Sequence, residues 1–337
     1  MGSDKTRERL RTNGISSALP RRAGRWMGSL ALAAGACMAL CTAAVAKAGD
    51  VERAGWLQAV SLAAAEEPAP APEPGKAIPL SFSIDYTLIS DYIWRGVNFS
   101  EYAGEGREKP NHQMGVGVAF ETEKFGTFSA GFWFEWFAGQ RSMDPASDGH
   151  LQEVDYTLSW SYDIEALATS VEVGWIAYQF PQSGGDAETS YEWYVSLGFD
   201  DSKLFGTDEA VLNPSVTYYM DVDLAKGGQW LEFGISHDFA LADLGCAETP
   251  VLKDVTLTPS LTLGVDHGYF TNATKLGNLL YGLAIGYDLS SALGLPQRYG
   301  SLSLTGTLNF SQALGIKDDL DGYQDEFFGG VTIGYEW

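Results

Sequence analysis

Acidic side chains alternate with large apolar residues along several stretches of the chain, as at Glu153 and Asp155 beside Val154 and Tyr156. Successive side chains of an extended strand point to opposite faces, so acids spaced in this way share one face. Carboxylates that ring a water-filled lumen concentrate cations and reject anions. The spacing therefore predicts a passage that favours cations.

Assigning the apolar series to the outside of a closed sheet leaves an inward set dominated by one sign of charge. We expect the lumen and its selectivity to be set by Asp91, Arg95, Glu135, Glu153, Asp155, Glu192, Asp221, Asp223, Glu232 and Asp266. Arg95 is the sole inward base, and strand periodicity places it on the same face as Asp91, as a structural ion pair or as a constriction. A second acidic collar, with Glu121 and Asp163 among its members, is expected below a throat of small neutral residues such as Thr217.

Signals for other chemistry are weak. None of the four histidines lies in a His-x-Ser sequence, so a lipid-modifying enzyme is the least favoured function. Lys317 and Phe328 stand where a twelve-residue calcium loop needs acidic ligands. We expect no catalytic residue, no metal site and no cofactor, and we predict that the protein is not an enzyme.

Strands with period-two alternation must position these acids. Twelve such segments are expected, at 80–95, 113–121, 127–137, 152–163, 169–180, 189–200, 214–223, 229–239, 255–267, 278–289, 300–311 and 326–337. Many of them match the roughly 9 to 11 residues that cross a bilayer at a tilt. The fold predicted is an all-β, antiparallel transmembrane β-barrel of about 12 strands, with 10 to 14 possible.

Aromatic residues gather toward the ends of the expected strands, among them Trp94, Trp136 and Tyr287. Such positions fit the aromatic girdles that flank the apolar band of a membrane barrel. Early connections also alternate between long and short, which is typical of a barrel whose two ends face different compartments. The last strand ends on Trp337, and it resembles the signal that outer-membrane barrels present to their assembly machinery.

The N-terminal part of the chain differs from the rest. Residues 1–48 carry an arginine-rich leader, an apolar run and small residues at candidate cleavage sites, and they are predicted to be a secretory signal peptide. Residues 49–79 are a flexible Pro/Ala/Glu-rich lead-in expected in the periplasm, and 80–337 form the barrel. Without 1–48 the chain holds 13 basic and 42 acidic residues, a formal charge of −29, which argues against a nucleic-acid partner.

Residues 88–97 read Leu-Ile-Ser-Asp-Tyr-Ile-Trp-Arg-Gly-Val. They resemble the S-D-Y-x-(F/W)-R-G segment near the start of an uncharacterised family of bacterial outer-membrane barrels, the Gcw_chp family. Residues 98–100, Asn-Phe-Ser, replace the polar continuation usual in that family. The resemblance implies a fold and a compartment, the outer membrane of a Gram-negative bacterium, but no substrate.

Two functions remain open from the sequence. The first is a small porin-like channel that passes cations or small neutral or cationic solutes through an acid-lined lumen. The second is a structural or surface-interaction barrel whose lumen is closed by loops or by residues 49–79. Outer-membrane lipid and the assembly machinery are expected partners of either, and small solutes or cations are expected partners of the channel. The transported solute and the oligomeric state are not predicted.

Overall fold

The computed structural model describes residues 79–100, 110–122, 124–137, 151–181, 189–249, 251–320 and 322–337. The expected signal peptide, and the expected lead-in apart from its last residue, lie outside the described residues. Within these ranges no helix is both long and apolar enough to cross a membrane.

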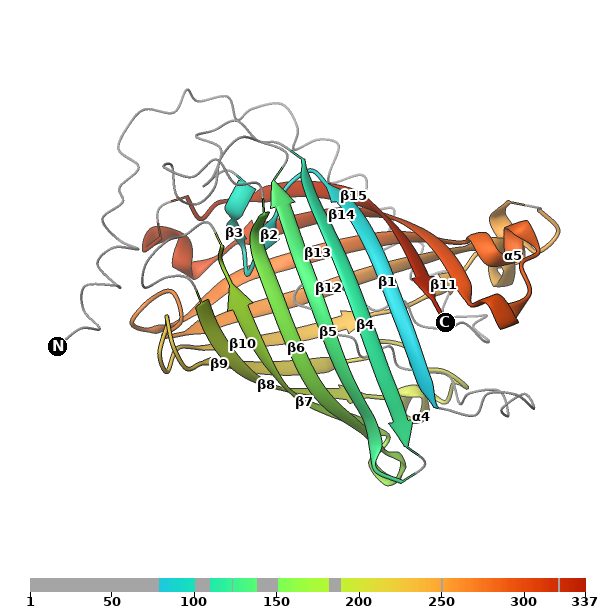
Figure 1. Cartoon of the computed structure of the whole chain (residues 1–337), viewed down its shortest axis with the longest axis horizontal. Helices are drawn as coiled ribbons and strands as arrows, with labels where there is room; N and C mark the ends of the chain where they lie inside the picture. The colour runs from blue at the N-terminus through green and yellow to red at the C-terminus, as the bar shows by residue number, and fades with distance from the viewer. Residues whose placement is uncertain are drawn as a thin grey trace.

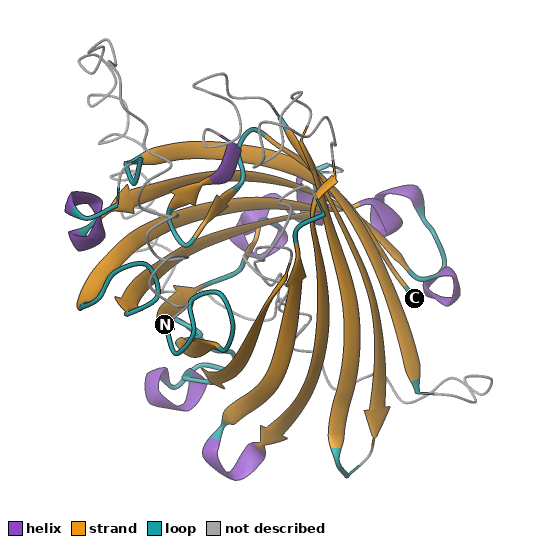
Figure 2. Ribbon diagram, turned by 60° about the vertical axis from the view of Figure 1, so that its left-hand side comes forward, coloured by secondary structure: helices purple, strands orange, loops and turns teal. Residues whose placement is uncertain are grey.

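A closed antiparallel barrel accounts for most of the described chain (Figures 1 and 2). Its twelve strands are β1 (Leu80–Ile89), β4 (Asn111–Thr122), β5 (Gly126–Phe137), β6 (Leu151–Ile164), β7 (Thr169–Gln179), β8 (Thr189–Phe199), β9 (Ser215–Asp221), β10 (Gln229–Ser236), β12 (Val255–His267), β13 (Thr274–Asp288), β14 (Ser301–Ala313) and β15 (Glu326–Glu336). Neighbours pair in chain order, and the pairings β1–β15 and β10–β12 close the ring. The predicted twelve-stranded barrel is confirmed.

Shorter elements lie at the two ends of the barrel. We call the end where β1 begins and β15 finishes the terminal end. It carries the helices α4 (Ser202–Phe205) and α5 (Leu289–Leu293), the π-helical turn η3 (Ala242–Cys246) and the 3-10 turns η1 (Glu165–Leu167), η4 (Leu252–Asp254) and η5 (Gln297–Tyr299). The short strand β11 (Phe239–Ala240) also lies there and pairs with β12 beyond the end of β10. The opposite end, here called the mouth, carries β2 (Ile93–Trp94), β3 (Val97–Asn98) and η6 (Gly315–Asp318) (Figure 1).

The outer face of the barrel is apolar and exposed. Along β1 the alternate residues Phe82, Ile84, Tyr86 and Leu88 are exposed, and on β6 Leu158 is 56% exposed. A water-soluble protein would bury such a continuous band, whereas a bilayer solvates it. The predicted transmembrane orientation of the apolar series is therefore confirmed.

The interior of the mouth half is packed with side chains. A buried cluster there contains Ile176, Tyr178, Tyr194, Tyr219, Trp230, Ala313, Ile316 and Tyr323, and Trp94, Val97, Tyr269 and Phe270 pack against it. The core of this molecule consequently lies inside the ring of strands.

The predicted strand limits agree with the structure to within a few residues, with one large difference. The first strand was expected over 80–95, but β1 ends at Ile89 and the chain then turns into the barrel. Trp94 accordingly packs in the lumen, and its expected place in an interfacial girdle is wrong. A smaller difference concerns β9, which ends at Asp221. Asp223 therefore lies in the β9–β10 connection and is exposed, and its expected position in the lumen is wrong.

Candidate functional site

A hairpin inside the mouth, residues 90–100, is the most unusual feature of the barrel. Its two strands pair Ile93 with Asn98 and Trp94 with Val97. The two residues between them have positive φ, 50° at Arg95 and 82° at Gly96. Positive φ at both central positions is the requirement of a type I′ turn, the tight turn that suits the twist of a two-stranded hairpin. The Arg-Gly pair thus forms the tip of the hairpin.

The guanidinium of Arg95 is held by a carboxylate and by aromatic rings. Nη1 and Nη2 donate to Glu192 Oε1 and Oε2 at 2.7 and 2.9 Å, a bidentate pair. The guanidinium carbon lies 4.3 Å from the centre of the Trp94 ring and 4.6 Å from those of Tyr219 and Tyr269. We call Glu192 and these three rings the Arg95 box.

The two opposite charges of the Arg95 box are buried and paired with each other. Arg95 is 3% exposed and Glu192 is fully buried, so neither charge is hydrated. Burial by itself would lower the pKa of Arg95, but the facing Glu192 carboxylate raises that pKa well above its usual value. Tyr178 adds a hydrogen bond to Glu192 Oε2 at 2.8 Å. Arg95 therefore stays charged, and its partner is Glu192 rather than the expected Asp91.

A second connection fixes the tip from above. The hydroxyl of Tyr323, between η6 and β15, donates to the Arg95 carbonyl at 2.9 Å. A Cβ on Gly96 would lie 2.2 Å from that hydroxyl oxygen, so glycine is required for space as well as for its backbone angle. At the base of the hairpin, Tyr92 N–H donates to Ser100 Oγ at 2.8 Å.

Two of the expected lumen acids accept hydrogen bonds from the connections between strands at the mouth. Asp221 accepts hydrogen bonds from Ser190 Oγ at 2.7 Å and from the backbone of Asp223 at 2.8 Å. Asp266 accepts from the backbone N–H groups of residues 269, 270 and 271 at 2.8 to 3.0 Å. Carboxylates used in this way order a turn, so these two act as anchors for the loops.

The acids nearest the base of the hairpin are more crowded. Glu135 and Glu153 are directly opposite each other on β5 and β6, and both are buried. Glu135 accepts a hydrogen bond from the Asn111 amide, while Glu153 is hydrogen-bonded to Tyr92 and Asp155. One carboxylate oxygen of Asp155, and one of Asp91, is buried without a hydrogen-bond partner in the described part of the chain.

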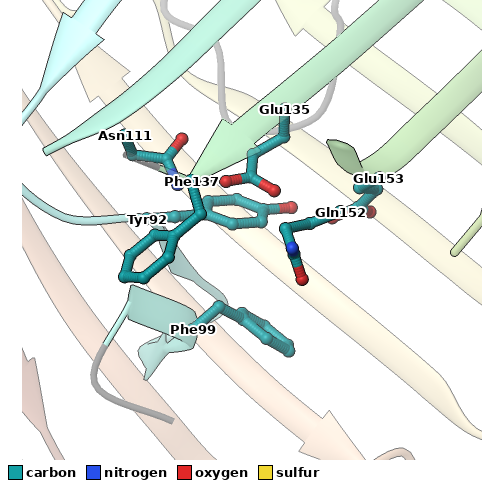
Figure 3. Close-up of a pocket in the computed structure, with 7 residues that line it drawn as sticks. All are labelled: Tyr92, Phe99, Asn111, Glu135, Phe137, Gln152 and Glu153. Carbon is teal, nitrogen blue, oxygen red and sulfur yellow. Dashed lines mark hydrogen bonds between the residues drawn. The ribbon is translucent and has the colours of Figure 1, made fainter. Parts of the chain in front are cut away.

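Between the hairpin and β4 to β6 lies a small pocket (Figure 3). Its lining combines the rings of Tyr92, Phe99 and Phe137 with the carboxyl groups of Glu135 and Glu153 and the amides of Asn111 and Gln152. Figure 3 shows the Glu135 carboxyl group beside the Tyr92 ring, with Gln152 and Glu153 contributed by β6. We call these seven residues the acid–aromatic pocket.

The remaining lumen holds fewer buried acids, among them Glu172, which is 5% exposed and accepts a hydrogen bond from the Tyr194 hydroxyl. Glu232 is half-buried and accepts a hydrogen bond from Trp230 Nε1 at 2.9 Å. Further toward the terminal end, hydroxyl pairs cross between strands, Ser196 with Thr217 at 2.8 Å and Thr87 with Thr332 at 2.7 Å. Within the described ranges, no three His, Cys, Asp or Glu side chains are grouped so that they could hold a metal ion.

The sequence predictions missed the aromatic half of the site. Tyr178, Tyr194 and Tyr219 face the lumen beside the expected acids. Their parity along the strand was the available signal, because Tyr194 lies two residues after Glu192. The expected inward set contains no aromatic residue, although a narrow barrel can fill its interior with aromatic rings.

Comparisons with known proteins agree with the family resemblance. Residues 73–224 match the model of a family described as a bacterial protein of unknown function (Gcw_chp), and the predicted resemblance is confirmed. No curated protein matches the chain.

Several solved barrel structures resemble this chain at low sequence identity. A KdgM porin is 12% identical, with 75% of this chain and 98% of that chain covered and a TM-score of 0.40. A NanC porin is 10% identical, with 75% and 98% covered and a TM-score of 0.40. An outer membrane channel from Pseudomonas putida F1 is 7% identical, with 79% and 100% covered and a TM-score of 0.44.

Proposed function

We propose that this chain, whose residues 73–224 match the Gcw_chp family, is an outer-membrane barrel that passes cations or small neutral or cationic solutes through a lumen narrowed by its own hairpin. The observation that carries the proposal is the charge inside the mouth. In the described part of the chain the buried acids there, besides Glu192, which Arg95 neutralises, are Asp91, Glu135, Glu153, Asp155, Asp221, Asp266 and Glu326.

The membrane assignment rests on the exposed apolar band. Residues such as Phe132 and Val195, 45% and 40% exposed on the outer face, lose their hydration penalty only in hydrocarbon. A closed sheet has no unpaired edge, so its backbone is satisfied within a bilayer. We place the mouth at the cell exterior and the terminal end in the periplasm, with the last strand as the segment read by the assembly machinery.

The cation preference follows from the surplus of carboxylates. Acids enclosed by low-dielectric walls focus a negative potential along the lumen axis. Anions entering the mouth would meet Glu153 and Asp155, and the positive charge of Arg95 is buried and paired with Glu192. Cations and neutral solutes face no such barrier.

A closed structural barrel is the second candidate, and the Arg95 box favours it. The hairpin is fixed by a buried ion pair, three rings and the Tyr323 hydrogen bond, so it could block the lumen permanently.

Single-barrel recordings in a planar bilayer with a salt gradient separate the two candidates. We expect a small conductance whose reversal potential favours cations. The absence of current from barrels that migrate as folded species on a heat-modifiability gel would contradict the channel and favour the closed barrel. A reversal potential that favours anions would contradict the role of the acids.

A further inference from the structure

Exposed aromatic side chains line one side of the terminal end. The strands β15, β1, β4, β5 and β6 are neighbours in the sheet, and Figure 1 shows β1, β4, β5 and β6 side by side. Each of the five has, within it or directly after it, a ring near this end that is 40 to 48% exposed, namely Trp337, Phe82, Phe120, Phe128 and Tyr162. The Phe82 and Trp337 rings stack with their centres 6.0 Å apart. We call these five residues the aromatic arc.

The aromatic arc is continuous with the apolar band that faces lipid. On β1 the exposed residues Ile84 and Leu88 follow Phe82 on the same face. Rings at the margin of such a band lie at the level of the lipid headgroups. The arc therefore places this margin at the terminal end.

Two connections of the terminal end are hydrogen-bonded to outward-facing rings at this margin. Trp160 Nε1 donates to the Phe125 carbonyl, between β4 and β5, at 2.6 Å. The Tyr335 hydroxyl donates to the Tyr299 carbonyl, in η5 between β13 and β14, at 2.7 Å. Both connections consequently lie beside the headgroup level.

Each of these two connections presents a basic residue next to an exposed ring. Lys124 precedes Phe125, which is 69% exposed, and Arg298 precedes Tyr299, which is 57% exposed. The guanidinium carbon of Arg298 lies 4.8 Å from the centre of the Tyr299 ring. In the described part of the chain, the basic residues that form salt bridges are Arg95, Lys253 and Lys275. Lys124 and Arg298 are both exposed and have no carboxylate partner there.

A positive charge without a partner, beside an apolar ring at the headgroup level, matches the phosphate of a phospholipid. Lysine and arginine near a membrane surface attract anionic lipid, and the guanidinium fork fits phosphate oxygens. A second copy of this strongly acidic chain would be repelled by like charge, whereas an anionic lipid offers both a phosphate and hydrocarbon.

We propose that the terminal end binds anionic phospholipid along the aromatic arc, with lipid phosphates on Lys124 and Arg298 and acyl chains against the rings. The inference concerns lipid rather than a passing solute, so it goes beyond the proposed function.

Native mass spectrometry of the whole chain in uncharged detergent, with equal amounts of phosphatidylglycerol and phosphatidylcholine of the same acyl chains, tests the site. We expect the folded barrel to retain phosphatidylglycerol over phosphatidylcholine by at least about threefold. The double variant Lys124→Gln with Arg298→Gln should retain the two lipids about equally. Lys124→Arg with Arg298→Lys keeps both charges and should keep the preference.

The matched control is the double variant Lys226→Gln with Lys317→Gln, which removes two positive charges at exposed positions of the mouth. It should prefer phosphatidylglycerol as the unaltered chain does, and a heat-modifiability gel shows that each variant is folded. The inference is overturned if the unaltered chain retains both lipids equally, or if it forms a dimer that retains neither. A preference that survives in Lys124→Gln with Arg298→Gln, or is lost equally in the mouth control, would also overturn it. No current is measured, so failure of the proposed channel leaves this result unaffected.

Discussion

Arg95 combines a strained backbone position with a charge that is paired and surrounded by aromatic rings inside the lumen. A non-glycine residue with φ of 50° has an energetic penalty, and asparagine is the usual choice in such a turn. The guanidinium compensates through two hydrogen bonds to Glu192 and three ring faces. The residue at the tip is therefore explained by its side chain rather than by turn propensity.

Replacing Arg95 by Gln should lower the free energy of unfolding in lipid vesicles by about 3 to 5 kcal/mol, because Glu192 would be left as a buried charge without its partner. The double change Arg95→Gln with Glu192→Gln should recover part of this loss, since no charge is then stranded. Urea titration followed by tryptophan fluorescence gives both values. An unchanged free energy of unfolding in Arg95→Gln would show that the Arg95–Glu192 pair does not stabilise the barrel.

Gly96→Ala tests whether the tip is confined. The variant should lose about 1 to 3 kcal/mol through a left-handed alanine and a collision with the Tyr323 hydroxyl. Gly206→Ala is the matched control, because Gly206 has φ of 69° and nothing within 4 Å of the added carbon. Chemical denaturation should find Gly96→Ala the more destabilised of the two, and equal losses would contradict the contact with Tyr323.

At the scale of elements, alternation alone predicted the barrel strands well. The β12 limits, Val255–His267, are those expected, because polar and apolar residues alternate there without interruption. The hairpin was not predicted because apolar and polar residues alternate throughout 80–95, although the pairing of β1 with β15 ends at Ile89. Only the Arg95-Gly96 turn signal marked the change, and no local pattern shows that a two-residue strand folds inward rather than onto the barrel wall.

The connection between β12 and β13 should depend on Asp266. Asp266→Ala removes the acceptor for three backbone N–H groups and one hydroxyl, so those donors lose their partner. Amide hydrogen exchange of residues 269–271 should become at least tenfold faster in the variant. Asp223→Ala, at an exposed position of another mouth connection, should leave exchange at 269–271 unchanged. Full protection in Asp266→Ala would contradict the anchoring role.

For the whole molecule, the direction of the apolar face decides the environment. Leu158→Lys places a charge at a 56% exposed position within β6, where the membrane barrel meets lipid. It should destabilise the folded state in vesicles by about 2 to 4 kcal/mol. Leu204→Lys, at a 75% exposed position of α4 beyond the strands, should have little effect. Equal stability of the two variants in lipid would contradict a transmembrane belt.

The sequence predicted the barrel class, because alternation along strands is a local pattern. Asp91, Glu135, Glu153, Asp155, Glu192, Asp221 and Asp266 are buried in the structure. Their individual partners could not be predicted, since Arg95 and Glu192 are 97 positions apart and meet only when β8 and the hairpin share the lumen. Long-range pairing of this kind depends on closure of the whole sheet.

The reversal potential of single barrels in a salt gradient tests the central claim, an acidic mouth that selects for cations, most directly. For the unaltered chain we predict a reversal potential that favours cations. The double variant Glu153→Gln with Asp155→Asn should have a smaller reversal potential. Glu248→Gln, which removes a charge at an exposed position of the terminal end, should have the same reversal potential as the unaltered chain. An unchanged potential in the conducting double variant, or a potential of anion-favouring sign in the unaltered chain, would contradict it.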